Sequence, residues 1–332
     1  MIQFAEGFGR GCAPFVVAGI LAGLPSVAAQ AQANAYPSHE VRVISAFPPG
    51  SGADIWARFF ADQARPLIGK PVIVENKPGA NGNIATEYVA RAKPDGYTIF
   101  IHSPTSLAAN KFMFKNTPID IEKTIETVAT LLKFSFYMTI DARRPWKNVG
   151  DVVAYAREKG DKATFATTSP PGRLMGNLFK EIMQLKAVEV PYRTAPDSLN
   201  DILSGAIDFS FNDGVFANSQ AREGRLRILA TGALERYRAN PEIPTMDEQG
   251  VKGLNVPGFF GVMVPVGTPR PVVNQINKWF VDVVASPAGQ EFILRFGGEP
   301  YSVSPEAAQK AYLNSIDEWG QLVKRANIKP EG

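Results

Sequence analysis

Short apolar runs rich in β-branched residues alternate, from residue 36 onward, with stretches whose apolar residues recur every three or four positions. The first run covers residues 41–47, and the helical spacing that follows it joins Ala53, Trp56, Ala57, Phe60 and Ala64. This alternation is typical of parallel sheets covered by helices, so the pattern predicts an α/β fold. The helical spacing also indicates that Trp56 and Phe60 belong to the core rather than to a ligand site.

The expected elements fall into two sets. The first set has strands at residues 41–47, 71–75 and 97–102, with helices through residues 53–64 and 83–92. The second set has helices at residues 149–158, 173–183 and 195–203, with strands at residues 164–168, 188–190, 207–211 and 226–231. A strand at residues 258–264 and helices at residues 269–285 and 305–327 follow, and we expect them to return to the first set.

Two crossings between these sets, near Thr139 and near Pro257, predict two α/β lobes joined by a hinge. Lobe 1 is predicted to hold residues 36–138 and 258–332, and lobe 2 residues 139–257. A chain of 332 residues is long enough for two lobes of ordinary domain size, each with its own core. Two crossings of this kind allow lobes to close on a ligand.

The N-terminal segment has a different character. Arg10 precedes an apolar stretch at residues 12–24, which is followed by Pro25 and a run of small residues. This order predicts a secretory signal peptide at residues 1–33 with cleavage after Ala33, and therefore a periplasmic protein. The alternative is a short membrane anchor, although the stretch is shorter than the roughly 20 apolar residues of a membrane span. The only cysteine, Cys12, lies in this segment, so disulfides and thiolate chemistry are excluded from the mature chain.

The segment at residues 47–54 ends a strand and opens a helix. It contains Phe47, Pro48, Gly50, Ser51, Gly52 and Asp54. In open α/β sheets, ligands bind beyond the carboxyl ends of strands, and free amides at a helix start suit an anion. A phosphate loop or a dinucleotide fingerprint is excluded because neither Gly-Lys-Ser/Thr nor a third glycine is present. The alternative is that Ser51 and Asp54 only cap the helix.

Three strings and their spacing carry a family resemblance: Phe-Pro-Pro-Gly-Ser-Gly-Ala-Asp at residues 47–54, Val-Glu-Asn-Lys-Pro-Gly-Ala-Asn-Gly-Asn-Ile at residues 74–84 and Lys-Pro-Asp-Gly-Tyr-Thr at residues 93–98. Further matches continue the order at residues 190–193, 207–209, 225–227, 243–245 and 264–269. Together they cover nearly all of the mature chain. The sequence resembles the Bug family, the substrate-binding components of tripartite tricarboxylate transporters.

The resemblance implies a periplasmic binding protein of the two-lobed, type II (Venus flytrap) class that captures a small carboxylate. It implies no cofactor, a monomeric protein, and inner-membrane transporter subunits as partners. Besides residues 47–54, the implied site has a second loop with His102, Ser103, Thr105 and Ser106, a third with Thr168, Ser169, Gly172 and Arg173, and a far wall with Tyr192, Arg193 and Asp208. For each far-wall residue a purely structural role stays open. For Asp54 two alternatives remain: it caps the helix, or it pairs with an amine of the ligand.

The third loop departs from the family pattern. Pro170 and Pro171 stand where a Gly-rich stretch is usual, and proline has no amide hydrogen to offer a carboxylate. Arg173 could compensate through a charge-assisted contact with a second acidic or polar group of the ligand, which would then be a dicarboxylate or an aromatic acid. The alternative is that Ser169 caps a helix whose first turn holds the prolines.

Composition narrows the classes of function. A net charge of +3 with scattered Lys and Arg gives no sign of nucleic-acid binding. His39 and His102 are the two histidines, and neither is placed for a Ser-His-Asp arrangement or a metal cluster. Asp54 and Asp208 could do acid–base work across a cleft, but nothing requires it. We therefore predict a binding protein, with a membrane sensor as an alternative partner and a periplasmic enzyme as the weaker alternative.

Overall fold

The computed structural model describes residues 36–115, 117 and 119–331. The predicted signal peptide, its cleavage after Ala33, and Cys12 lie outside the described residues. Within the described ranges, no helix is both long enough and apolar enough to cross a membrane.

The chain folds into alternating strands and helices. In chain order the principal elements are β1 (Val41–Ser45), α1 (Gly52–Ile68), β2 (Val72–Asn76), α2 (Asn83–Ala90), β3 (Thr98–His102), α3 (Pro104–Met113), α4 (Ile121–Thr124), β4 (Ile125–Phe134), β5 (Phe136–Asp141), α5 (Val149–Lys159), β6 (Thr164–Thr167), α6 (Pro170–Ile182), β7 (Val188–Pro191), α7 (Ala195–Ser204), β8 (Phe209–Asp213), α8 (Gly214–Arg222), β9 (Leu226–Thr231), β10 (Gly258–Pro265), α9 (Arg270–Ala285), α10 (Pro287–Arg295), β11 (Glu299–Pro300) and α11 (Pro305–Arg325).

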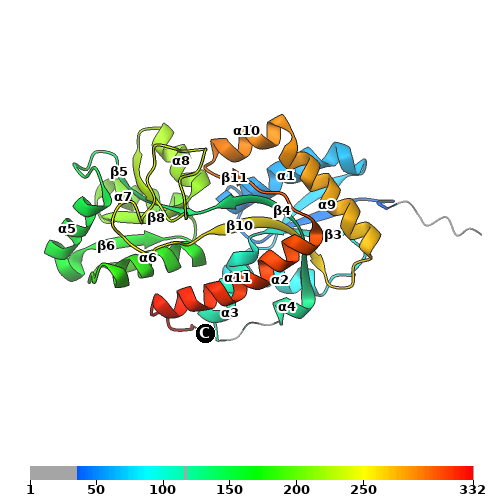
Figure 1. Cartoon of the computed structure of the whole chain (residues 1–332), viewed down its shortest axis with the longest axis horizontal. Coiled ribbons are helices and arrows are strands. Elements are labelled where there is room, and N and C mark those ends of the chain that lie inside the picture. Colours follow the sequence, from blue (N-terminus) through cyan, green and yellow to red (C-terminus); the bar gives the residue numbers. More distant parts are fainter. Residues whose placement is uncertain (1–35, 116, 118, 332) are drawn as a thin grey trace, which may run out of the picture. The chain divides into compact units, whose positions relative to one another are not determined.

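The first sheet has six strands in the order β11-β4-β10-β3-β1-β2. β1 pairs in parallel with β2 and β3, whereas β10 pairs antiparallel with β3 and β4. The long neighbours β4 and β10 can be followed side by side in Figure 1. The late helices α9 and α11 pack on β4, which agrees with their predicted return to the first set of elements.

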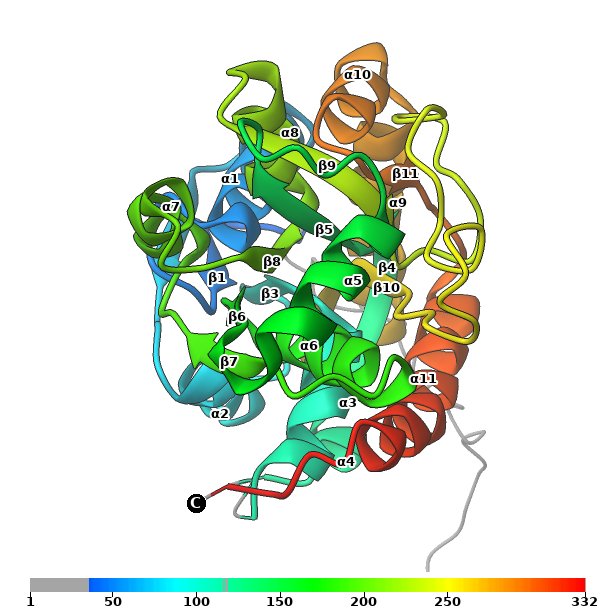
Figure 2. The ribbon, with the colours of Figure 1, turned by 90° about the vertical axis from the view of Figure 1, so that its left-hand side faces the viewer.

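The second sheet has five strands in the order β7-β6-β8-β5-β9. β6 pairs in parallel with β7 and β8, and β5 pairs antiparallel with β8 and β9. α6 packs on β6, β7 and β8, while α7 and α8 contact β5 and β8 (Figure 2). A cluster of rings fills the space under α6, where Phe165, Phe179, Phe209 and Phe211 are fully buried. Each buried ring of this size stabilises the fold by roughly 1.5–3 kcal/mol.

The chain passes between the sheets at two places. β4 belongs to the first sheet and β5 to the second, and only the buried Ser135 separates them. The return runs from the end of β9 through residues 232–257 to β10. Thr139 lies inside β5 and pairs with Ser210 of β8, so the crossing predicted near Thr139 lies earlier in the chain, at Ser135.

Several elements were not predicted. β4 and β5 are buried along almost their whole length, so they lack the apolar–polar alternation that marks a half-exposed strand. α3 is buried at eight of its ten residues and is rich in small polar residues, which hides any helical apolar stripe. The segments predicted as loops around Ser103 and Ser169 are short. α3 begins at Pro104 and α6 begins at Pro170, so most of each predicted loop belongs to a helix.

Candidate ligand-binding site

Two adjoining pockets lie where the loops of the two sheets meet. The first, which we call the aromatic pocket, is lined by Phe47, Ser51, Gly52, Ala53, Trp56, His102, Ser103, Ser106, Phe134, Phe136, Thr168, Ser169, Pro171, Arg193, Thr194, Ala195, Asp213, Gly214, Phe260 and Phe296. The second, which we call the polar pocket, shares some of these residues and adds Ala46, Pro48, Pro78, Gly79, Ala80, Asn81, Gly82, Met113, Phe114, Thr167, Pro170, Arg173, Glu189, Pro191, Tyr192 and Glu331.

Five helices begin at the aromatic pocket. Their N-terminal caps are Ser51 for α1, Ser103 for α3, Ser169 for α6, Thr194 for α7 and Asp213 for α8, and all five line the pocket. The first amides of a helix have no partner inside the helix and carry partial positive charge. The pocket is therefore surrounded by positive helix ends.

The loop at residues 47–54 is held from within by Asp54. One oxygen of the Asp54 carboxylate accepts from the Gly50 amide at 2.9 Å and from Arg58 Nε at 2.9 Å, and the other accepts from Asn76 Nδ2 at 2.6 Å. Asp54 is 1% exposed and lines neither pocket. In this structure the Asp54 carboxylate therefore has a structural role, holding the loop through Gly50, Arg58 and Asn76.

The same loop presents only part of itself to the pockets. The Gly50 amide is occupied by Asp54, and Gly50 lines neither pocket. Phe47, Ser51 and Gly52 line the aromatic pocket, and Pro48 lines the polar pocket. In the part of the chain that the structure describes, the amides of Gly52 and Ala53 donate to no protein acceptor. These two amides are the donors that the loop can offer to a ligand.

His102 ends β3 beneath the aromatic pocket. Its ring stacks on Phe100 with a centroid distance of 5.0 Å and lies 5.4 Å from the Phe47 ring. Neither ring nitrogen has a hydrogen-bond partner among the described residues. Burial lowers the pKa of His102 to about 3, so the imidazole is neutral at neutral pH. A neutral ring with no carboxylate partner is not arranged as a catalytic base.

The burial of His102 gives stability a pH dependence. Unfolded chains protonate this ring near its ordinary pKa of 6.5, whereas the folded protein does so only near pH 3. Between these values the unfolded state binds more protons, so the free energy of unfolding falls as the pH is lowered, by up to about 1.4 kcal/mol per pH unit. We expect a loss of about 2 kcal/mol between about pH 7 and about pH 5. Urea unfolding of the parent and of His102→Gln at both pH values measures it.

The exposed histidine provides the control for this measurement. His39→Gln should keep the acid-dependent loss of stability, because His39 is exposed in the lead-in to β1. If the parent and His102→Gln lose the same free energy of unfolding on acidification, the carboxylates alone cause the pH dependence of stability.

The second predicted loop contributes through the start of α3. Ser103 Oγ accepts from the Ser106 amide at 3.2 Å, and it also lies 2.8 Å from the Thr105 hydroxyl. Ser103 and Ser106 line the aromatic pocket, whereas Thr105 does not line either pocket. Thr105 therefore supports the Ser103 hydroxyl from behind instead of facing a ligand.

The third predicted loop is the start of α6. Ser169 caps the helix, accepting from the Gly172 amide at 3.5 Å, and Pro170 and Pro171 occupy its first turn. This confirms the capping alternative for Ser169. Thr168 and Ser169 line both pockets. Gly172 lines neither, because it packs against Phe136 and the Phe211 carbonyl.

Arg173 lines the polar pocket, but carboxylates of the protein already engage it. Its Nε lies 3.3 Å from Glu189, and its terminal nitrogen Nη2 lies 2.5 Å from Glu331 near the C-terminus. The Glu331 and Glu189 carboxylates raise the pKa of the Arg173 guanidinium further above its ordinary value. A ligand acid would have to compete with two protein carboxylates for this side chain.

Of the three residues implied for the far wall, Tyr192 and Arg193 line the pockets. Tyr192 lines the polar pocket and donates to Asp201 at 2.5 Å, while Arg193 lines both pockets. Arg193 makes no ion pair with a described residue, in contrast to Arg173. Arg193 is therefore the side-chain cation that the pockets leave available for an acid.

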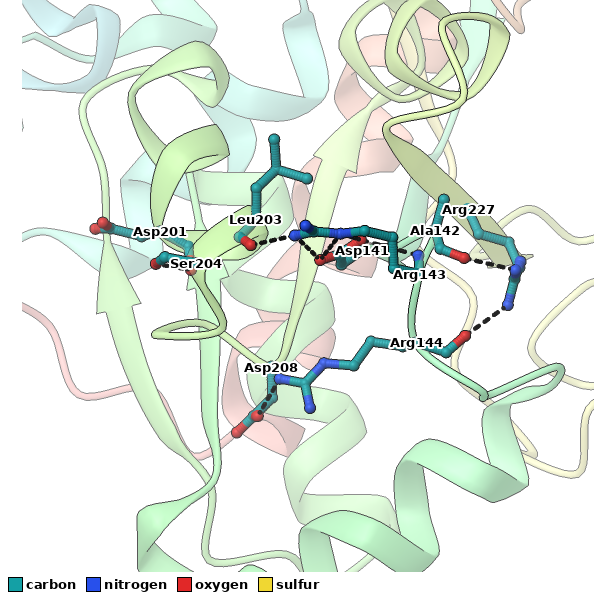
Figure 3. A network of polar contacts seen from close by, with 9 residues as sticks. All are labelled: Asp141, Ala142, Arg143, Arg144, Asp201, Leu203, Ser204, Asp208 and Arg227. Carbon is teal, nitrogen blue, oxygen red and sulfur yellow. Dashed lines mark hydrogen bonds and ion pairs between the residues drawn. The ribbon is translucent and has the colours of Figure 1, made fainter.

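Asp208, which the resemblance implied for the far wall, lines neither pocket. Its carboxylate accepts from Tyr155 Oη at 2.7 Å, from Arg144 Nη2 at 3.2 Å and from the Thr164 amide at 3.0 Å, and it is 3% exposed. Figure 3 shows Asp208 within a polar network that includes Arg144 and Arg227. Asp208 precedes β8, so it lies at the amino end of a parallel strand, opposite the edge where ligands bind.

Asp213 is the main site residue that the sequence reasoning missed. It lies at the carboxyl end of β8 and caps α8, accepting from the Phe216 amide at 3.1 Å. The sequence did contain a sign of this site: a strand that ends in Asp-Gly before a helix has the same order of elements as residues 47–54, and ligands bind at such strand ends. The strand was predicted to end at Phe211, two residues too early. Burial raises the pKa of the Asp213 carboxyl, although amides of the first turn of α8 favour its charged form.

Aromatic lining residues were also missed. Trp56, predicted to be core only, is 4% exposed as expected but borders the aromatic pocket. Phe134 and Phe136 flank the crossing at Ser135, and Phe260 and Phe296 come from β10 and the residue after α10. Their strands carry no polar pattern at the pocket, so sequence alone offers no sign of this role. Among residues 36–115, 117 and 119–331, no group of three His, Asp or Glu side chains could hold a metal ion.

Two mixed α/β sheets, two chain crossings and a pocket bordered by both sheets define a two-lobed, type II binding-protein fold. The model of the tripartite tricarboxylate transporter family receptor matches residues 56–328. A UPF0065 protein of Bordetella bronchiseptica is 32% identical to this chain, covering 90% of this chain and 89% of that protein. The chain therefore belongs to the tripartite tricarboxylate transporter receptor family, which confirms the predicted resemblance.

Solved structures agree with this assignment. An R. palustris protein with adipate has a TM-score of 0.84 at 26% identity, covering 89% of this chain and 100% of that one. The periplasmic binding protein BugD has a TM-score of 0.81 at 29% identity, again covering 89% of this chain and 100% of its own. The chain is thus a receptor of the solute-binding class.

Proposed function

We propose that this chain is a periplasmic solute-binding protein that holds a small carboxylate in the aromatic pocket and delivers it to inner-membrane subunits of a tripartite tricarboxylate transporter. The observation that carries the proposal is the convergence of five helix N-termini on one pocket. A carboxylate placed there accepts from free amides and is stabilised by the positive helix ends. The solved structure of the R. palustris protein with adipate supports an acid as ligand.

The donors for the carboxylate are the Gly52 and Ala53 amides, the hydroxyls of Thr168 and Ser169, and the Arg193 guanidinium. Each charge-assisted hydrogen bond contributes roughly 1.5–3 kcal/mol. Three or four of them, less the cost of association and lobe closure, correspond to binding near the micromolar range. Arg193 is preferred to Arg173 as the cationic contact because Glu189 and Glu331 already neutralise Arg173.

The remaining features of the proposal concern export and motion. Residues 1–33 are removed as a signal peptide, and the mature monomer is free in the periplasm. The lobes close on the acid by bending at Ser135 and within residues 232–257, where the chain passes between the sheets. The protein releases the acid chemically unchanged, because neutral, unpartnered His102 and buried Asp54 offer no acid–base pair.

Recovery of the natural ligand tests the proposal. The protein purified from a native-like host is denatured, and the released small molecules are identified by mass spectrometry. We expect an unmodified carboxylic acid in the parent and in Arg91→Ala, whose arginine pairs with Glu87 on the exposed face of α2. Arg193→Ala should retain at least about tenfold less acid, because it loses one charge-assisted contact. A neutral ligand, or conversion of an added acid to product, would contradict the proposal.

A further inference from the structure

Six aromatic side chains line the aromatic pocket: Phe47, Trp56, Phe134, Phe136, Phe260 and Phe296. All of them except Phe47 also lie against one another. The Trp56 ring lies 6.4 Å from Phe260 and 6.1 Å from Phe296, and Phe134 lies 5.2 Å from Phe260, measured between centroids. Rings that brace one another keep a fixed surface, and such a surface suits a flat apolar body.

The aromatic pocket is small and does not stand alone. Its cavity volume is ≈ 70 Å³, and the polar pocket, which shares Phe47, Thr168, Ser169 and Arg193 with it, adds ≈ 540 Å³. A cavity that holds benzene measures roughly 150 Å³, so a ring held between the aromatic walls reaches into the polar pocket. The aromatic walls favour a flat ring at this point over a long, flexible chain.

Asp213 is the one carboxylate among the residues that line this pocket. It is partly exposed there and accepts from the Phe216 amide of α8. Within the described ranges, no Lys, Arg or His side chain forms an ion pair with it. The acids of the adjoining polar pocket are paired, since Glu189 and Glu331 both contact Arg173. Asp213 therefore faces the pocket as an acceptor whose natural complement is a hydrogen-bond donor.

We infer that the ligand is a monocarboxylic acid with one aromatic ring and a hydroxyl or amino substituent that donates to Asp213. This inference rests on the proposed function, because it assigns the carboxylate to the helix N-termini and Arg193. The ring lies between the aromatic walls, and the donor lies at the start of α8. A second carboxylate is selected against, since it would add a further like charge beside Asp213, whose carboxylate already lies next to Gly52, where the first carboxylate binds.

Calorimetry with matched acids tests this inference. The probes are benzoate, meta- and para-hydroxybenzoate, isophthalate, terephthalate and adipate, each titrated into the ligand-free full protein. The better hydroxybenzoate is expected to bind at least about tenfold tighter than benzoate, which lacks the donor. Isophthalate and terephthalate, which carry a carboxylate at the same ring positions, should bind at least about tenfold weaker than the hydroxybenzoates.

Asp213→Asn separates a specific contact from general shape. Asparagine keeps the capping role but lacks the negative charge. The affinity of the better hydroxybenzoate should then exceed that of benzoate by about threefold or less, and isophthalate and terephthalate should bind more tightly than they do to the parent. The control is Asp151→Asn, which alters an acid at the exposed start of α5 and should leave the order of affinities unchanged.

The failures of the two proposals are distinguishable. Tightest binding by adipate or terephthalate, or an order unchanged in Asp213→Asn, overturns the inference and leaves carboxylate binding intact. Binding of none of the six acids also overturns the inference, and in that case the chemical class of the ligand recovered after denaturation decides whether the proposed function falls with it.

Discussion

Gly52→Ala is expected to weaken binding of the recovered acid by about a hundredfold. A Cβ atom at Gly52 would lie 2.3 Å from Asp213 Oδ1 and 2.8 Å from its Cγ, so α1 and the Asp213 side chain cannot both keep their positions. Asp213 is held by the Phe216 amide, and moving it loses a cap worth about 1 kcal/mol. Displacing the start of α1 misplaces the Gly52 and Ala53 amides, and losing a charge-assisted hydrogen bond of about 1.5–3 kcal/mol lowers affinity by about a hundredfold at the upper end of this range. Calorimetry of the variant measures the loss.

Gly50→Ala is the matched control for this change. Gly50 has φ +81°, and a Cβ atom added there would have no other atom within 4 Å. Alanine at this position therefore strains the backbone by about 1–2 kcal/mol without reaching the pocket. Its melting temperature should fall while its affinity stays within about threefold of the parent. An affinity for Gly52→Ala as high as that of Gly50→Ala would show that Asp213 and α1 adjust freely around the added methyl group.

The part of the fold that could be predicted is the part with a half-exposed face. α1 buries Trp56, Ala57, Phe60 and Ala64, and this spacing is plain in the sequence. β4 has no such face, since it lies between β10 and β11 under helices α9 and α11. Buried Thr127 and Thr130 interrupt the apolar residues of β4, so this strand shows neither a regular alternation nor a continuous apolar run from which it could be predicted.

Ser51 was predicted because a strand, a cap and a helix follow one another in the sequence at residues 47–54. Ser103 and Ser169 were implied by the family resemblance instead. All three residues line the aromatic pocket. Asp208 and Asp213 show the limit of this approach. They stand at opposite ends of the five-residue strand β8, roughly 16 Å apart at about 3.3 Å per residue. Asp208 was implied by the family resemblance, whereas Asp213 was overlooked because the predicted strand ended two residues too early, at Phe211.

Asp208→Ala is expected to lower the free energy of unfolding by about 3 kcal/mol while leaving ligand affinity unchanged. The substitution removes the acceptor for Tyr155, Arg144 and the Thr164 amide. The Arg144 side chain is about a quarter exposed, and its guanidinium lies 4.8 Å from the centroid of the Trp146 ring. In the variant, Arg144 keeps the contact with this ring and with solvent but loses its counter-charge. Removing one partner of a largely buried pair costs about 3–5 kcal/mol, and the partial exposure of Arg144 places this case at the lower end. Urea unfolding followed by calorimetry measures both quantities.

Asp62→Ala is the matched control, because Asp62 pairs with Arg65 on the exposed face of α1, where both side chains are about half exposed. An exposed pair of this kind contributes about 0.2–1 kcal/mol, so the variant should remain close to the parent in stability. A loss of affinity in Asp208→Ala without a loss of stability would return Asp208 to the ligand site. A loss of stability without a loss of affinity would show that Asp208 has a structural role. In that role it joins the start of β8 to the start of β6 and to Arg144. These contacts hold the second sheet in the register that brings Asp213 to the pocket.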